Sequence, residues 1–498
     1  MSAPLYFDHA ATTPLDPRVA AAMQPWLGGH HGNASSAHPF GARARDAVEE
    51  SRAAVAALVD APVRDIVFTS GATESNNLAI LGLARGLRVQ RGGAPGHLVS
   101  ARTEHKSVLD PLSQLVREGH AVSWLDPDER GVIAPQAVAA ALRADTVLVS
   151  LMHANNEIGV IQDIAAVGAL CRARGVALHV DAAQSAGKIA VDVGALQADL
   201  LSLSAHKFYG PQGCGALYVG TPWRAQLQPL QFGGGQERGL RSGTLPVAQI
   251  VGIGAAARIA RLEWHDEAAR LLALRESLLA GIEPLGGITV NGAGAARVPG
   301  ILNLSFDGVH GEALLAGLEE LALSTSAACN ADSDETSYVL RALGRDPLLA
   351  QASLRFSLGR FTTAADVEAA IGALRRELPA LRALADFGQP EPAGWCSGEA
   401  GNRGEGMQVR WRLRSAGGAI AEADYRAFAS APVRRVCDGL AEQLPGRPLG
   451  DGQPGTPADW LVRWGVPADQ LGRLLSVEDA LQVALRVALE KTPAAARP

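Results

Sequence analysis

Short apolar runs alternate with Ala-rich and Leu-rich stretches through roughly the first 380 residues of the chain. Three of these runs, at residues 66–69, 146–152 and 176–180, have the length and mainly apolar character of strands buried on both faces. Stretches of helical character separate them, and this alternation is typical of βαβ units around a parallel sheet. The pattern therefore predicts an α/β fold.

Polar or small residues directly follow each of the three predicted strands, at residues 70–77, 153–157 and 181–184. In open α/β sheets, ligands bind beyond the carboxyl ends of the strands. We therefore expect these three clusters to meet in one crevice, which is the expected site of chemistry.

The composition changes near residue 387, where a stretch rich in Gly and Pro begins and extends to residue 406. Such a stretch is typical of a linker, and it predicts a first domain over 1–386 and a second over 407–492. Residues 493–498 are expected to form a frayed tail. A chain of 498 residues is long enough for two or more domains.

Composition and charge argue against several classes of protein. The net charge is −6, with 45 Lys and Arg against 51 Asp and Glu, so the chain has no strong basic field to bind nucleic acid or an anionic membrane. It contains no run of about 18 apolar residues and no basic segment followed by an apolar one at its start, and we expect a cytoplasmic protein. The five cysteines lie far apart without a Cys-x-x-Cys pair, which predicts neither a disulfide framework nor a metal site.

Only four of the 45 basic residues are lysines, Lys106, Lys188, Lys207 and Lys491, so chemistry that needs a side-chain amine must use one of them. Lys207 follows the apolar run 200–203 and stands between a histidine and a Gly-Pro turn. A partly desolvated lysine in such a place can act as a Schiff-base nucleophile, although most lysines are solvated surface residues. Among the four, Lys207 has the least surface-like neighbours.

Two further segments favour a bound cofactor. Residues 70–77 lead into a helical run that begins at Leu78. Free N–H groups at a helix N-terminus can hold phosphate, although an ordinary capped helix start explains the segment equally well. Asp181 follows the strand 176–180, where a carboxylate can pair with the pyridinium nitrogen of pyridoxal phosphate; a helix N-cap is the alternative.

Eight short motifs are spread along residues 6–385. They are DHAATTP at 8–14, GATES at 71–75, TEHK at 103–106, NNEIG at 155–159, HVDAAQS at 179–185, SAHK at 204–207, RGLRSGT at 238–244 and RFSLGR at 355–360. In this combination the chain resembles the cysteine desulfurases of the IscS/NifS type, within the class V branch of the fold-type I pyridoxal-phosphate enzymes. The resemblance implies a large, mainly parallel-sheet domain over about 15–260 and a small α/β domain built from the N-terminal segment and about 261–386.

The resemblance also implies roles for individual residues. Lys207 would form the Schiff base with pyridoxal 5′-phosphate, Asp181 would pair with the ring nitrogen, and His105 would stack on the ring. Asn156 and Gln184 would contact the ring and its 3′ oxygen. The residues expected to hold the phosphate come from several segments and are Ala72, Thr73, Ser204, His206 and, across a homodimer interface, Thr244.

Three more residues complete the site that the resemblance implies. Asn33 and Arg355 would bind the substrate carboxylate, and Cys329 would be the nucleophile. Cys329 lies in the run 324–332 of mostly small or polar residues, which suits a thiolate that must travel between substrate and acceptor; a buried, inert thiol is the alternative. The run lacks the glycine that many loops of the family carry before this cysteine.

The implied reaction converts free L-cysteine to L-alanine and a Cys329 persulfide, with proton transfers that involve Lys207 and His105. The persulfide would deliver its sulfur to an acceptor protein, for iron–sulfur cluster assembly, another thio-cofactor or tRNA thiolation. Alternatives remain open: a selenocysteine lyase, another class V aminotransferase-like enzyme, or a non-catalytic assembly or regulatory protein.

The second domain resembles the IscU/NifU-type iron–sulfur scaffold in three segments, 407–413, 418–428 and 475–481. The first two predict a strand pair, and the third predicts a helix with Ser476 as its N-cap. The three cluster cysteines of a scaffold would fall at positions that are Arg403, Ser430 and Arg473 here. Because a guanidinium cannot coordinate iron as a thiolate does, we expect a degenerate scaffold that docks an acceptor or covers the sulfur-transfer surface.

Overall fold

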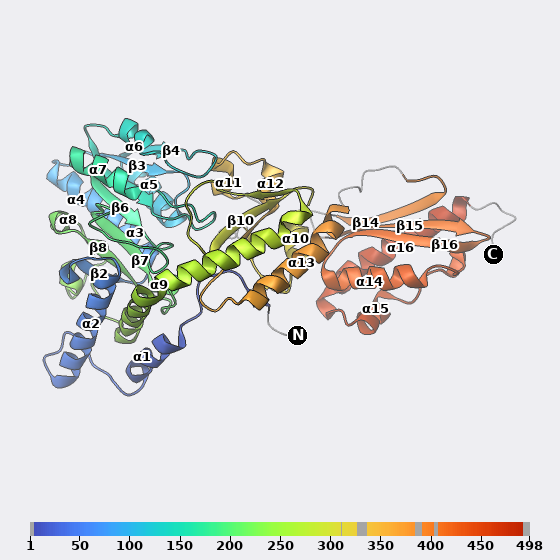
Figure 1. Cartoon of the computed structure of the whole chain (residues 1–498), viewed down its shortest axis with the longest axis horizontal. Coiled ribbons are helices and arrows are strands. Elements are labelled where there is room, and N and C mark those ends of the chain that lie inside the picture. The colour runs from blue at the N-terminus through green and yellow to red at the C-terminus, as the bar shows by residue number, and fades with distance from the viewer. Residues whose placement is uncertain (1–3, 310, 326–335, 384–390, 403–406, 492–498) are drawn as a thin grey trace.

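The chain forms a large α/β body, to which a smaller C-terminal module is attached at one end of the long axis (Figure 1). The computed structural model describes residues 4–309, 311–325, 336–383, 391–402 and 407–491. Within the large body, a seven-stranded sheet forms one domain and a four-stranded sheet lies in a second.

The seven-stranded sheet follows the apolar runs of the sequence. Its strands, in spatial order, are β2 (Ile66–Thr69), β8 (Gly215–Val219), β7 (Leu200–Ser204), β6 (Ala177–Asp181), β5 (Thr146–Met152), β3 (His97–Ala101) and β4 (Ala121–Leu125). All pairings are parallel except the two of β8. The bounds predicted for β2 and β5 are confirmed, whereas β6 begins and ends one residue later than predicted, so that Asp181 is the last residue of the strand.

Both faces of this sheet are covered, which explains the mainly apolar runs. Neighbouring residues of one strand belong to two different core clusters: Leu98, Leu148 and Leu200 pack on one face, and Val99 and Leu178 pack on the other. This alternation follows from the two-residue period of a strand. The helices of this domain are α1 (Pro17–Leu27), α2 (Pro39–Leu58), α3 (Ala72–Asn77), α4 (Leu83–Gln90), α5 (Lys106–Arg117), α6 (Pro135–Ala141), α7 (Ile164–Arg174) and α8 (Thr221–Arg224).

The long helix α9 (Val247–Ile282) connects the two domains of the large body (Figure 1). Its first half packs on α1 and α2, and it also packs on α13 (Ala364–Ala383) of the second domain. The contact with α2 is close, because a Cβ added at Gly254 would lie 2.6 Å from the Cβ of Ser51. A rigid helix of this length fixes how the two domains face each other.

The second domain contains an antiparallel sheet in the order β12 (Ser324–Thr325), β13 (Ser353–Ser357), β10 (Ile301–Phe306) and β9 (Ile288–Val290). Its helices are α10 (Gly311–Gly317), α11 (Tyr338–Ala342), α12 (Pro347–Gln351) and α13 (Ala364–Ala383). Strand β1 (Leu5–Tyr6) pairs with β11 (Leu321–Ala322), so the N-terminal segment belongs to this domain.

In its described residues, the C-terminal module contains an antiparallel sheet and three α-helices. The strands are β14 (Trp395–Asn402), β15 (Met407–Ala416) and β16 (Ala419–Phe428), and the helices are α14 (Ala431–Gln443), α15 (Pro457–Trp464) and α16 (Leu471–Lys491). Strands β15 and β16 form the predicted pair. Residues 395–402, which the composition assigns to a linker, are instead paired with β15 along their whole length.

Two predictions for this module were wrong for local physical reasons. Gly398 lies in β14, where it pairs with Trp411 of β15, and glycine is needed there because a Cβ would clash with the backbone nitrogen of Ala484 in α16. A glycine that permits close packing looks, in the sequence, like a glycine of a flexible linker. Helix α16 begins at Leu471, and Ser476 lies inside it; the buried Leu474 already belongs to the helix face that packs on the sheet.

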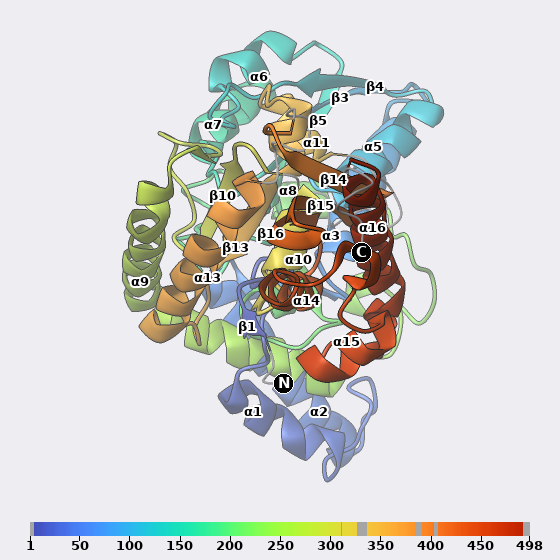
Figure 2. The same cartoon turned by 90° about the vertical axis from the view of Figure 1, so that its right-hand side faces the viewer.

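The module contacts the large body through the junction of β16 and α14. Phe428, the last residue of β16, packs into the core of the second domain together with Leu314 and Leu381. Arg434 of α14 forms an ion pair with Glu377 of α13, and both side chains are largely buried. Figure 2 views the molecule from the side of the module, with α14 in front of α10.

Candidate active site

A cavity of about 730 Å³ opens at the carboxyl ends of the parallel strands, between the two domains of the large body. This volume is in the range of small-molecule sites. The turn after β2, the start of α5, the loop after β5, the end of β6 and the turn after β7 all line it, as do β12 and β13 of the second domain. The polar clusters that follow the predicted strands therefore meet in one crevice, as the sequence predicts.

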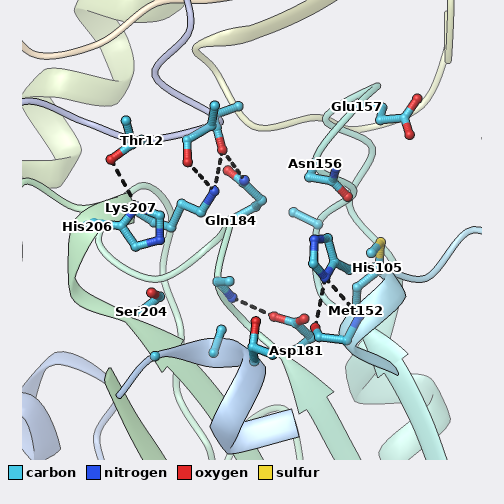
Figure 3. A pocket seen from close by; sticks show the side chains of 18 of the residues that line it. Thr12, His105, Met152, Asn156, Glu157, Asp181, Gln184, Ser204, His206 and Lys207 are labelled. Atoms are coloured by element: carbon cyan, nitrogen blue, oxygen red, sulfur yellow. Dashed lines mark hydrogen bonds between the residues drawn. The ribbon is translucent and has the colours of Figure 1, made fainter. Parts of the chain in front are cut away.

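Lys207 projects into this cavity from a single 3₁₀ turn, Ala205–Lys207, directly after β7. Its Nζ donates hydrogen bonds to the carbonyl oxygens of Ala10 at 2.6 Å and Ala11 at 2.7 Å (Figure 3). These carbonyls belong to the N-terminal segment, which precedes Lys207 by almost 200 residues in the sequence. The amine is thus held at a defined point of the cavity wall.

Asp181 is held from two sides on the cavity floor. Its Oδ2 accepts a hydrogen bond from Nδ2 of Asn76 at 2.7 Å, and its Oδ1 accepts one from the backbone N–H of Ala183 at 2.9 Å. Asn76 also donates to Oγ of Ser107 at 2.9 Å. Sequence reasoning missed Asn76 and Ser107, and the available signal was an asparagine and a serine in helices that bury them, because a buried polar side chain requires partners.

His105 is the N-cap of α5, and its ring faces the cavity. Its Nδ1 accepts a hydrogen bond from the backbone N–H of Ser107 at 3.1 Å, so the neutral ring carries its proton on Nε2. Burial lowers the pKa of His105 below its ordinary value of 6.5, against the opposing effect of Asp181. A neutral imidazole is therefore present at neutral pH, on the opposite side of the cavity from Lys207 (Figure 3).

The turn between β2 and α3 supplies the expected anion cradle. Gly71 has φ 152°, a backbone conformation that favours glycine, and α3 begins at Ala72, not at Leu78 as predicted. Ala72 and Thr73 line the cavity, and their position at the first turn of the helix gives them N–H groups without intrahelical partners. A Cβ at Gly215 of β8 would lie 2.5 Å from the Cα of Gly71, so the neighbouring strand also needs a glycine.

Ser204 and His206 form another part of the cavity wall, near this cradle. Burial lowers the pKa of His206 to about 4, and the charge of Lys207 adds to the effect. Nδ1 of His206 lies 3.0 Å from Oγ1 of Thr12. A neutral imidazole can donate a hydrogen bond to a phosphate without adding a second full charge.

Arg355 reaches the cavity from β13 of the second domain. Its Nη2 forms an ion pair with Asp8 at 2.7 Å, and its Nη1 donates to the backbone oxygen of Asn156 at 2.8 Å. Within the described part of the chain, the buried Nε of Arg355 and the buried Oδ1 of Asn156 have no hydrogen-bond partner. Buried polar atoms normally have partners, so these two atoms are suited to a bound molecule.

Two expected site residues, Asn33 and Thr244, do not line the cavity. Asn33 is exposed, and its Oδ1 accepts a hydrogen bond from the backbone N–H of Ser35. Thr244 is also exposed and does not line the cavity of its own chain. Cys329 lies outside the described residues. Ser324 and Thr325 line the cavity, so β12 ends at the cavity wall.

The residues present fit pyridoxal phosphate. An amine, a carboxylate, a neutral imidazole and an anion cradle face one cavity, and Oδ1 of Asn156 awaits a donor. Among the residues that the structure describes, no group of three or more His, Cys, Asp and Glu side chains is placed to hold a metal ion. The four described cysteines are buried and do not line the cavity; they are Cys171, Cys214, Cys396 and Cys437. In the same described ranges, no helix has the length and apolar character needed to span a membrane.

Glu157 lies at the cavity edge, and we expect it to make the stability of the protein depend on pH. Its Oε2 accepts a hydrogen bond from Oγ of Ser337 at 2.5 Å, and burial raises its pKa from 4.5 to about 7. A carboxyl group whose pKa is raised by folding stabilises the protein fully below pH 4.5, and this contribution is lost as the pH rises through 7. We expect Glu157→Gln to remove a pH dependence of about 3 kcal/mol in the free energy of unfolding.

Denaturant unfolding at several pH values between 5 and 8 checks this prediction. Relative to the native chain, Glu157→Gln should gain stability as the pH rises, whereas the control Glu129→Gln, at an exposed position, should run parallel to the native chain. Parallel curves for all three proteins would contradict the raised pKa.

Known proteins are similar to the large body in sequence and in fold. The family model described as "Aminotransferase class-V" matches residues 5–370. A protein of Psychromonas ingrahamii named "Cysteine desulfurase IscS" is 52% identical over 385 residues, which is 77% of this chain and 94% of that protein. A protein of Tolumonas auensis with the same name is 53% identical over 387 residues, 77% of this chain and 95% of that protein. The solved structure of a "NifS-like protein" covers 76% of this chain and 99% of its own, with a TM-score of 0.69 and 34% identity.

Proposed function

The chain belongs to the class V aminotransferase family and is a cysteine desulfurase, and we propose that pyridoxal 5′-phosphate binds at Lys207 and that Cys329 receives the sulfur. The observation that carries the proposal is the convergence of Lys207, Asp181 and His105 in one cavity. Its wall includes Thr325 of β12, the strand that leads toward Cys329.

Pyridoxal phosphate, when bound, supplies an electron sink for the bonds at the substrate Cα. The carboxylate of Asp181, oriented by Asn76 and Ala183, would keep a proton on the ring nitrogen, and the neutral ring of His105 would stack on the cofactor. The amine of Lys207, which the carbonyls of Ala10 and Ala11 hold at the cavity wall, would take and return protons.

The phosphate and the substrate carboxylate would be bound at separate ends of the cavity. Backbone N–H groups at Ala72 and Thr73, together with Ser204 and His206, favour the phosphate. The buried guanidinium of Arg355, with its unpartnered Nε, favours the carboxylate, because arginine offers a planar set of donors that matches it. Asn33 would have to move to take part.

The sulfur step is a transfer between two thiols. The thiolate of Cys329 attacks the sulfur of L-cysteine, an S–S bond forms, and the C–S bond of the substrate breaks. The carbon that loses sulfur takes up a proton and becomes the methyl group of L-alanine. The products are one L-alanine and one Cys329 persulfide, so the reaction needs no external oxidant or reductant.

Mass spectrometry tests this proposal directly. The full chain is loaded with pyridoxal phosphate, incubated briefly with L-cysteine, alkylated and digested. The expected result is one equivalent of L-alanine and one added sulfur atom on the peptide that contains Cys329. The peptides that contain the buried Cys171 and Cys437 should carry no added sulfur in the same digest. Alanine without sulfur on Cys329, or sulfur found first on another cysteine, would contradict it.

We further propose that the enzyme is a homodimer in which Thr244 contacts the phosphate of the partner site, and that an acceptor protein takes the persulfide sulfur. The exposure of Thr244 in one chain is consistent with such a contact. Sedimentation of the holoenzyme should give twice the mass of the chain. A monomer that still forms alanine would contradict the shared site.

For the C-terminal module, we propose a degenerate iron–sulfur scaffold. Two of its three expected cluster positions lie close together: Oγ of Ser430 is 3.1 Å, and Nη1 of Arg473 is 3.0 Å, from the same Oε1 of Gln470. The third position, Arg403, lies outside the described residues. Hydrogen bonds would thus replace metal–thiolate bonds, and the proposed role of the module is to dock an acceptor or to cover the sulfur-transfer surface.

A further inference from the structure

A second lysine, Lys188, lies behind the wall of the active-site cavity and has no part in the mechanism above. It follows the turn after β6, where Gly187 adopts φ 73°. A Cβ at Gly187 would lie 2.9 Å from the Cβ of Phe208, so the turn packs tightly beside the segment that carries Lys207. This geometry places Lys188 next to Gln184, and Nζ of Lys188 donates a hydrogen bond to Oε1 of Gln184 at 2.8 Å.

Gln184 connects Lys188 to the reactive lysine. Nε2 of Gln184 donates to the backbone oxygen of Ala10 at 2.8 Å, and Nζ of Lys207 donates to the same oxygen at 2.6 Å. A hydrogen-bonded path therefore runs from Lys188 through the Gln184 amide to the carbonyl that holds Lys207 (Figure 3 shows the last two bonds).

The two ends of the Gln184 amide have different partners, and this fixes its orientation. If the amide turned over, its NH₂ group would face the Nζ donor of Lys188, and its oxygen would face the carbonyl oxygen of Ala10. Both contacts would be repulsive, since each would pair two donors or two acceptors. With the observed orientation, one N–H of Gln184 remains available on the cavity side.

The surroundings of Lys188 contain more positive than negative charge. Lys207 and Arg355 oppose a charge on Lys188, and Glu267 favours it. Glu267 is already paired with Arg360 at 2.8 Å, so it compensates only in part. Burial is the main reason that the pKa of Lys188 falls from 10.5 to about 7, and Lys207 is the next cause.

The remaining titratable neighbours of Lys188 are neutral near physiological pH. The pKa of His9 and that of His206 both fall to about 4, mainly because of burial, and Lys188 contributes to each shift. The cavity of about 20 Å³ behind Lys188 is lined also by Tyr209 and Glu267 and has room for about one water molecule. Little water is therefore available to screen Lys188 from Lys207.

We propose that Lys188 is a positioning residue: its Nζ holds the Gln184 amide so that an N–H faces the 3′ oxygen of the cofactor ring, and the protonated form of Lys188 favours the neutral form of the Lys207 nitrogen. The inference rests on the proposed binding of pyridoxal phosphate at Lys207. Lys188 acts through Gln184 and through space, and it touches neither substrate nor cofactor.

A visible-absorption titration of the holoenzyme tests the effect of charge. Lys188→Met keeps an unbranched side chain that is one atom shorter and removes the charge and the donor, while Lys188→Arg keeps both the charge and the donor. The expected result is that the pH midpoint of the cofactor band rises by about one pH unit in Lys188→Met, because a neighbouring positive charge no longer opposes protonation at Lys207. Lys188→Arg should stay closer to the native midpoint, and the control Lys491→Met, at an exposed position, should not shift it.

A double-mutant cycle on cofactor affinity tests the path through Gln184. Pyridoxal phosphate is titrated into cofactor-free full chain and followed by absorbance. We expect Lys188→Met to weaken binding about tenfold in the native background and by less than about twofold when Gln184 is replaced with leucine, because the amide that Lys188 orients is then absent. This comparison remains decisive if one holoenzyme variant is too unstable for the pH titration.

Different results would contradict the role of Lys188 and the binding of pyridoxal phosphate on which that role depends. An unchanged midpoint in Lys188→Met, or equal effects of Lys188→Met with and without Gln184, would overturn the positioning role while the native band still supports cofactor binding. A native chain that binds no pyridoxal phosphate would overturn the proposed function itself.

Discussion

Replacing Lys207 with alanine is expected to abolish the formation of L-alanine from L-cysteine, with a loss of about 10⁴-fold or more. Two functions disappear with this one amine: the covalent link to the cofactor and the proton transfers at the substrate. Of the three other lysines, Lys188 donates to Gln184 at the back of the cavity wall, and Lys106 and Lys491 do not line the cavity. No other amine is therefore placed to replace Lys207 along the part of the chain that the structure describes.

Two measurements on the same preparations check this prediction. Alanine is quantified after incubation with L-cysteine, and the cofactor is trapped with borohydride and located by peptide mapping. The native chain should carry the label on Lys207, Lys207→Ala should carry none, and Lys491→Ala should behave like the native chain. A visible cofactor band that survives in Lys207→Ala, with trapping on another lysine, would contradict the assignment.

Replacing Cys329 with alanine is expected to remove the persulfide and to lower alanine formation by about 10³-fold or more, since the step then lacks its nucleophile. Binding of pyridoxal phosphate should remain, because the residues that surround Lys207 are unchanged. This combination distinguishes a missing nucleophile from a misfolded protein. It also distinguishes Cys329 from Lys207, whose replacement removes the linked cofactor as well.

The matched control for this variant is Cys171→Ala. Burial raises the pKa of Cys171 to about 12, so its thiol is not ionised at neutral pH and cannot act as a nucleophile. Its replacement should leave the rate of alanine formation and the amount of persulfide unchanged. Alanine release at the native rate from Cys329→Ala, with persulfide still formed, would exclude Cys329 as the sulfur carrier.

Strands that are buried on both faces were the features most accessible from the sequence. The runs that became β2 and β5 are mostly apolar and are buried at every position, because helices and core residues cover both faces of the sheet. Lys207 was recognisable for a related reason, since it ends such a run with a histidine and a Gly-Pro turn beside it. The pattern of apolar residues thus indicated where the crevice would form.

Features that depend on close packing were less accessible. Gly398 allows α16 to approach β14, yet a glycine in a Gly-rich stretch predicts a linker. Ser476 has the residue type of a helix cap, but α16 begins five residues earlier. Asn76, which holds Asp181, carries no separate motif of its own.

The sequence by itself determined the class of fold, three strands of the large sheet and the candidate for a reactive lysine, because local spacing and residue type control each of these. The tertiary structure alone decided which polar groups form hydrogen bonds to the same acceptor. Gln184 and Lys207 donate to the same carbonyl of Ala10, and this contact requires that the N-terminal segment join the second domain through β1 and β11. Lys188 is the clearest case, because this lysine belongs to no motif and its hydrogen bond to Gln184 depends on the turn at Gly187.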